Sequence, residues 1–74
     1  MRHILDAKSL LCPLPVLKAR KRLKALNIGD ELELQADDPA AIVDVPHYCA
    51  EAGHTLLETR EEDGFHVYVI RKDS

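Results

Sequence analysis

A cysteine set just before a proline-containing, basic stretch is the residue of this 74-residue sequence that most directly suggests chemistry. Cys12 opens the run Cys12-Pro13-Leu14-Pro15, after which apolar residues recur at helical spacing. Proline is tolerated in the first turn of a helix, where backbone N–H groups have no partner within the helix. The pattern therefore predicts a helix over residues 13–26 with Cys12 as its N-cap. Pro13, Leu14 and Pro15 would shape the site, with the Leu14 N–H directed toward the Cys12 sulfur.

The predicted position of Cys12 has a chemical consequence. The N-terminus of a helix carries partial positive charge and favours anions, and the thiolate is the nucleophilic form of cysteine. We therefore expect Cys12 to lose its proton more readily than a free cysteine and to act as a nucleophile. The alternative is a buried, unreactive cysteine, because free cysteines are among the most buried residues.

The other candidate ligands and nucleophiles form no recognisable constellation. Cys49 lies in an apolar stretch that predicts a core residue, although a resolving cysteine for Cys12 stays open. No Cys-x-x-Cys occurs, and we predict neither a metal nor a cofactor. Cys12 could form a nucleophilic pair with His47 or His54 only if the fold brings one of them close to it, and the sequence does not show this. None of the four histidines stands at the spacing of a metal site: His3, His47, His54 and His66.

Composition indicates one small cytoplasmic domain over residues 1–74. Apolar residues make up 46% of the sequence, which is enough for a two-layer core. No apolar run approaches the ~18 residues of a membrane span, and the stretch Met1–Asp6 does not read as a signal peptide. In the cytoplasm the two cysteines are expected to be thiols.

The basic residues are unevenly distributed although the net charge is −3. They concentrate on the first predicted helix, and we predict that Lys18, Lys21 and Arg22 bind an acidic partner protein. The alternative is a solvated helix face. The acidic net charge argues against direct binding of nucleic acid, as does the scarcity of aromatic residues, with Tyr68 the only candidate on a sheet face.

Periodicity completes the expected architecture. Leu32, Leu34 and Ala36 alternate with polar residues, so they should face the core. A second helix should begin at Pro39 and be closed by Gly53, and Pro46 should kink or split it near Val45. Asp37 and Asp38 would cap it. Strands are predicted over residues 3–7, 31–36, 55–61 and 65–71.

The order of elements is therefore β-α-β-α-β-β, an α+β fold. Its economical form is a two-layer α/β sandwich, with a mixed four-stranded sheet and both helices on one face. In the last strand, Phe65, Val67 and Val69 should share one face. Tyr68 and Ile70 should lie on the other, wholly or partly wet face.

With these elements in place, the sequence resembles the small sulfur-carrier proteins of the TusA/SirA-like family. The resemblance rests on the Cys-Pro-x-Pro motif at residues 12–15 and on matching stretches at 5–7, 36–40 and 68–72, and it extends over residues 4–72. It implies a two-layer α/β sandwich and a persulfide on Cys12. A cysteine desulfurase or another sulfurtransferase would load the sulfur, and a downstream relay protein would accept it.

The resemblance leaves the pathway open. Members of the family serve tRNA thiolation, cofactor assembly or sulfur oxidation, and Leu14 stands where TusA proper usually has glutamate. Such a carrier depends on partner proteins, and we expect it to be a monomer. Two other classes of function also remain at this point: a non-catalytic regulatory or nucleic-acid-binding module, and a thiol redox protein using Cys12 and Cys49.

Overall fold

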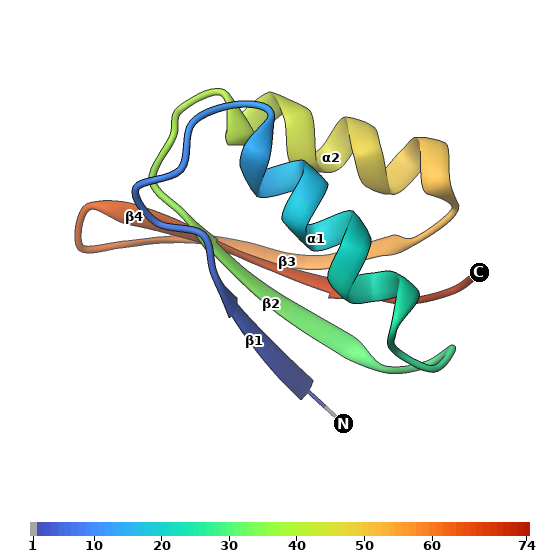
Figure 1. Cartoon of the computed structure of the whole chain (residues 1–74). Helices are drawn as coiled ribbons and strands as arrows, with labels where there is room; N and C mark the ends of the chain where they lie inside the picture. Colours follow the sequence, from blue (N-terminus) through green and yellow to red (C-terminus); the bar gives the residue numbers. More distant parts are fainter. Residues whose placement is uncertain (1) are drawn as a thin grey trace.

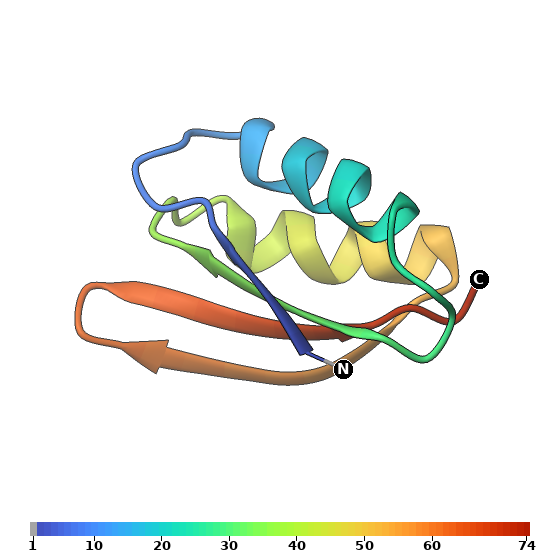
Figure 2. The ribbon, with the colours of Figure 1, turned by 60° about the horizontal axis from the view of Figure 1, so that its bottom comes forward.

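The computed structural model describes residues 2–74 and has the predicted order of elements, β-α-β-α-β-β. Its four strands form one sheet, and both helices pack on the same face of that sheet (Figure 1, Figure 2). This arrangement confirms the two-layer α/β sandwich. The elements are β1 (Arg2–Asp6), α1 (Leu14–Lys24), β2 (Glu31–Ala36), α2 (Ala41–Ala52), β3 (Thr55–Glu62) and β4 (Phe65–Arg71).

The sheet is mixed, with the strand order β1-β2-β4-β3. β1 and β2 run parallel and are joined through α1, whereas β4 runs antiparallel to both β2 and β3. Because β1 and β2 are parallel, the loops that follow them leave the sheet at the same end (Figure 1). This end of the sheet therefore brings the segment around Cys12 close to the segment that precedes α2.

Helix α1 is shorter than predicted. It spans Leu14–Lys24, and its N-cap is Pro13 rather than Cys12, without any side-chain cap hydrogen bond. At its other end the N–H groups of Ala25 and Leu26 donate to carbonyls three residues back, at 3.1 Å each. These bonds tighten the last turn, so the regular helix ends before residue 26. The buried residues of α1 repeat every four positions: Pro15, Ala19 and Leu23.

Helix α2 begins two residues later than predicted, at Ala41, and ends as expected at Gly53, which has a left-handed φ of 80°. Pro46 lies inside it, yet the helix is continuous across the proline and is not split. Proline costs one ladder hydrogen bond, but Pro46 is on the exposed side. The buried residues on both sides of it pack against the core and keep the helix in one piece: Ala41, Val45 and Cys49.

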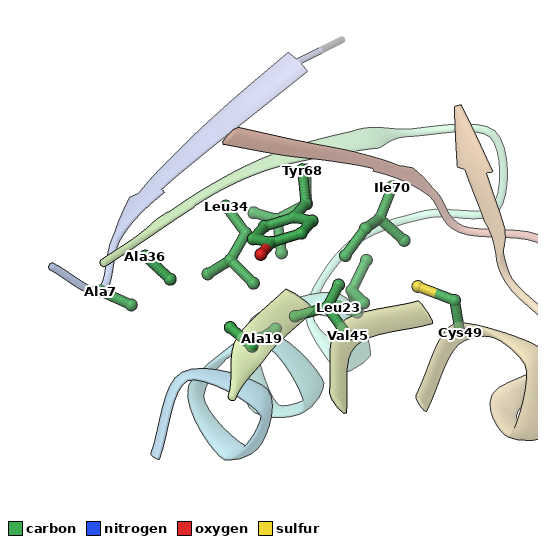
Figure 3. Packing of buried hydrophobic residues seen from close by; sticks show 11 residues of the cluster. Ala7, Ala19, Leu23, Leu34, Ala36, Val45, Cys49, Tyr68 and Ile70 are labelled. Carbon is green, nitrogen blue, oxygen red and sulfur yellow. The ribbon is translucent and has the colours of Figure 1, made fainter. Parts of the chain in front are cut away.

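The core lies between the sheet and the two helices. Figure 3 shows side chains of α1 and α2 meeting those of β2 and β4, with Leu34, Tyr68 and Ile70 on the helix-facing side of the sheet. Leu32, Leu34 and Ala36 are buried as predicted. The buried core is aliphatic apart from the ring of Tyr68 and the thiol of Cys49.

The predicted facing of β4 is wrong. Tyr68 pairs with Leu34 and Ile70 pairs with Leu32, so both follow the inward residues of β2 into the core. Val67 and Val69 lie on the opposite face, where they are still only 1% exposed. Because apolar residues occupy both faces of β4, the sequence of this strand does not show which face points to the helices. The register with β2 determines that face. The burial of Tyr68 also removes the aromatic residue considered for nucleic-acid stacking.

Replacing Tyr68 with phenylalanine should stabilise the fold. Among residues 2–74, the Tyr68 hydroxyl is the buried side-chain polar atom without a hydrogen-bond partner. An unsatisfied buried hydroxyl costs about 1–3 kcal/mol, so we expect Tyr68→Phe to raise the free energy of unfolding by roughly 1 kcal/mol. Urea denaturation of both proteins measures this difference. A loss of stability would instead indicate that the hydroxyl is hydrogen-bonded in solution.

Candidate functional site

Cys12 lies in the connection between β1 and α1, two residues before the helix, and it is exposed. Cys12 is therefore not a buried core residue. The prediction that the Leu14 N–H points at the Cys12 sulfur is wrong, because this N–H donates to the carbonyl of Leu11 at 2.8 Å. Pro13 caps the helix and lines the same groove as Cys12, while Pro15 is buried beneath the first turn. The motif thus anchors an accessible thiol at the start of α1.

Two adjacent aspartates hold the segment around Cys12. The carboxylate of Asp37 accepts the Ser9 N–H at 3.0 Å, and that of Asp38 accepts the Cys12 N–H at 2.5 Å. Asp38 also accepts the N–H of Ala40 at 3.1 Å, although the N-cap of α2 is Ala40 and has no side-chain cap bond. The pair predicted to cap α2 therefore ties the loop after β2 to the loop after β1.

A third carboxylate contacts the sulfur itself. The Cys12 thiol donates a hydrogen bond to Asp44 Oδ2 on α2, with 2.7 Å between the sulfur and the oxygen. This hydrogen bond raises the pKa of Cys12, and desolvation and the charges of Asp44 and Asp38 add to the effect. The pKa of Cys12 is therefore shifted opposite to the expected direction, because carboxylates face the thiol and Cys12 is not the N-cap of α1.

Asp44 was missed by the sequence analysis. Its contact with Cys12 spans 32 positions in the chain, which no local pattern reports. A weak signal did exist, since Asp44 is the only charged residue in the apolar stretch over residues 39–46.

Cys12 opens onto a groove between α1 and α2 with a volume of about 680 Å³. This volume is in the range of small-molecule pockets, about 300–1,000 Å³, and leaves space beside the thiol for a second reacting group. Its polar lining is mixed in charge. Lysine and arginine side chains come from α1 and the C-terminal segment, and carboxylates come from α2. The lining side chains that can carry charge are Arg20, Lys24, Asp44, His47, Glu51, His54 and Lys72.

The three basic residues predicted to bind a partner lie elsewhere on α1. Lys18, Lys21 and Arg22 line a separate hollow together with Leu5 and Ala25. One of them is engaged within the chain, because the Arg22 guanidinium donates to the carbonyl of Ile4 at 3.3 Å. The basic face of α1 is therefore divided between the Cys12 groove and the side toward β1.

Neither histidine of the groove contacts Cys12 in the part of the chain described. His47 pairs with Glu51 one turn along α2, and His54 accepts the Asp73 N–H at 3.3 Å. Within residues 2–74 there is also no group of three or more histidine, cysteine or acidic residues arranged to hold a metal. Neither helix of that range is long and apolar enough to span a membrane.

Cys49 is a core residue. It is 2% exposed, and burial raises the pKa of its thiol to about 11. Both cysteines are free thiols, and Cys49 does not line the Cys12 groove. Figure 3 shows its sulfur among the packed side chains between α2 and the sheet. This environment favours a packing role over that of a resolving cysteine.

Fold and site together define a small α/β protein that offers one accessible cysteine to other molecules. Residues 3–72 match the family model of Sulfurtransferase TusA. The Sulfur carrier protein TusA of Allochromatium vinosum is 40% identical over 68 residues, which cover 92% of this chain and 90% of that protein. The protein of the same name from Pseudomonas aeruginosa is 42% identical over 69 residues, covering 93% and 87%. The chain belongs to the TusA sulfurtransferase family.

A solved structure agrees on the fold. The crystal structure of a SirA-like protein from Desulfitobacterium hafniense has a TM-score of 0.84 and covers the whole of both chains at 24% sequence identity. This likeness concerns the backbone arrangement alone.

Proposed function

We propose that the chain is a sulfur carrier that holds sulfur as a persulfide on Cys12 and passes it to an acceptor protein. The observation that carries the proposal is the exposed Cys12 thiol beside an open groove. Membership of the TusA family supports the same role. The thiol is within reach of another protein's cysteine, whereas Cys49 is not.

The transfer needs two exchange steps. The Cys12 sulfur, as thiolate, attacks the outer sulfur of a donor persulfide, the donor's S–S bond breaks, and the donor cysteine leaves as a thiolate that takes up a proton. An acceptor thiolate then attacks the outer sulfur on Cys12 and releases Cys12. A persulfide is already activated, so neither step requires an oxidant or reductant, nor a catalytic acid or base of this chain.

The donor is proposed to be a cysteine desulfurase or another sulfurtransferase, and the acceptor a downstream relay protein. Lys18, Lys21 and Arg22 would bind an acidic surface of one of them, because their charges are concentrated on one side of α1. The carrier would work as a monomer that meets its partners in turn. We place it in the cytoplasm, where thiols stay reduced, with no direct contact to nucleic acid.

Incubation with a cysteine desulfurase and cysteine tests the proposal. The intact mass of the wild-type chain should rise by about 32 Da, one sulfur atom, and return to its starting value on reduction. Peptide mapping after alkylation should place that sulfur on the peptide containing Cys12. An unchanged mass, or a sulfur confined to Cys49, would contradict the proposed carrier site.

A further inference from the structure

The carboxylate of Asp44 has an unusual set of partners. Its Oδ2 lies 2.7 Å from the Cys12 sulfur. Within the described part of the chain, no lysine, arginine or histidine forms an ion pair with Asp44. Asp44 is partly buried at the groove wall, so water only partly screens its charge. The thiol is therefore the group that this carboxylate faces.

Other charged groups lie around the sulfur, and the two side chains that hydrogen-bond Cys12 are both carboxylates. Asp38, from the loop before α2, accepts the Cys12 N–H and adds a second negative charge. Basic side chains from α1, α2 and the chain end line the same groove: Arg20, Lys24, His47, His54 and Lys72. Within the described residues, no ion pair joins any of them to Asp44, and His47 pairs with Glu51. A carboxylate that accepts a hydrogen bond from a thiol stabilises the protonated form and repels the thiolate.

We propose that Asp44 holds the unloaded Cys12 as a hydrogen-bonded thiol and so sets the pH at which Cys12 becomes nucleophilic. This inference rests on the proposed function of Cys12. In the loading step the proton must leave the Cys12 sulfur for water before that sulfur, as a thiolate, attacks the donor persulfide. The departing donor thiolate then takes up a proton from water. Overall, a thiol and a persulfide become a persulfide and a thiol, so protons and electrons balance.

The same contact affects the second step. A thiol with a higher pKa is a poorer leaving group in exchange reactions, so Asp44 slows the loss of sulfur to small thiols. It also slows the reaction of the empty carrier with small electrophiles, because the thiolate is the reactive form. A partner that draws Asp44 away from the sulfur would release both restraints, since it would then permit formation of the thiolate.

The test is the pH profile of Cys12 alkylation by iodoacetamide, measured by mass in a Cys49→Ala background. Asp44→Asn keeps the shape of the side chain and removes its charge. We expect its Cys12 to be alkylated about threefold or more faster near neutral pH, with the profile moved to lower pH. Asp38→Asn is the matched control, because Asp38 contacts the backbone of Cys12 and not the sulfur. It should give a smaller change.

Desulfurase loading of Asp44→Asn should rise in parallel near neutral pH, because the thiolate is the attacking species. Asp44→Ser, a smaller neutral variant, must move the alkylation profile in the same direction, and thermal melts verify that each variant is folded. A wild-type profile in either folded neutral variant would overturn the inference, as would an Asp38→Asn change as large as that of Asp44→Asn. Alkylation needs no sulfur donor, so a failure of Cys12 to load would not affect this readout.

Discussion

Serine at position 12 should abolish sulfur loading. Cys12→Ser keeps the size and exposure of the side chain but removes the one accessible sulfur among residues 2–74. A serine hydroxyl cannot take part in exchange with a persulfide, because the reaction proceeds through a thiolate and a sulfur–sulfur bond. After incubation with a cysteine desulfurase and cysteine, we expect no gain in mass for the variant, against about 32 Da for the wild type.

Cys49→Ala is the matched control for this prediction. It removes the other sulfur from a site that is 2% exposed and lies outside the Cys12 groove. The variant should lose some stability through the small cavity it leaves, but it should load sulfur like the wild type. A mass gain that survives Cys12→Ser and disappears with Cys49→Ala would assign the carrier role to the buried cysteine and refute the proposed mechanism.

Reversing the charge of Lys18 and Lys21 together should slow loading by about tenfold at low salt, because complementary charge accelerates the encounter of two proteins. The slower encounter should lower the slope of the initial loading rate plotted against carrier concentration. It should fade at about 1 M salt, where the screening length is about 3 Å. Loading rates measured with a cysteine desulfurase at low and high salt provide the comparison.

The chain offers a control with the same change in net charge. Arg20 and Lys24 belong to the same helix but line the Cys12 groove, whereas Lys18 and Lys21 line the hollow toward β1. Comparing the double reversals Lys18→Glu/Lys21→Glu and Arg20→Glu/Lys24→Glu therefore separates the position of a charge from the total charge. If only the groove pair slowed loading, the predicted binding role of Lys18 and Lys21 would be wrong.

Local sequence patterns predicted most of the fold. The alternation in β2 identified Leu32, Leu34 and Ala36 as inward residues, and Gly53 marked the end of α2. These patterns did not predict which face of β4 points to the helices, because residues 67–70 are all buried. A strand that is apolar on both faces has no preferred face of its own, so its orientation depends on pairing with a neighbouring strand. Only the register with β2 shows that Tyr68 and Ile70 belong to the helix side.

The same division applies to the site. A cysteine followed by prolines at a helix start was visible in consecutive residues, and its exposure supports the interpretation. The groups that control its protonation were not visible, because Asp38 and Asp44 are 26 and 32 positions away along the chain. The parallel pairing of β1 and β2 brings them together, and that pairing is a property of the tertiary fold. An argument from helix termini alone therefore predicted the wrong direction for the pKa of Cys12.

The separation of Cys12 from the packed interior has a physiological consequence. The Cys12 sulfur, which would carry the transferred sulfur atom, is on the surface, and Cys12 is not part of the core between the sheet and the helices. Gaining or losing sulfur therefore requires no repacking of the interior and changes only contacts at the surface, such as that between Cys12 and Asp44. We therefore expect a partner that distinguishes the two forms to do so by direct contact at the groove.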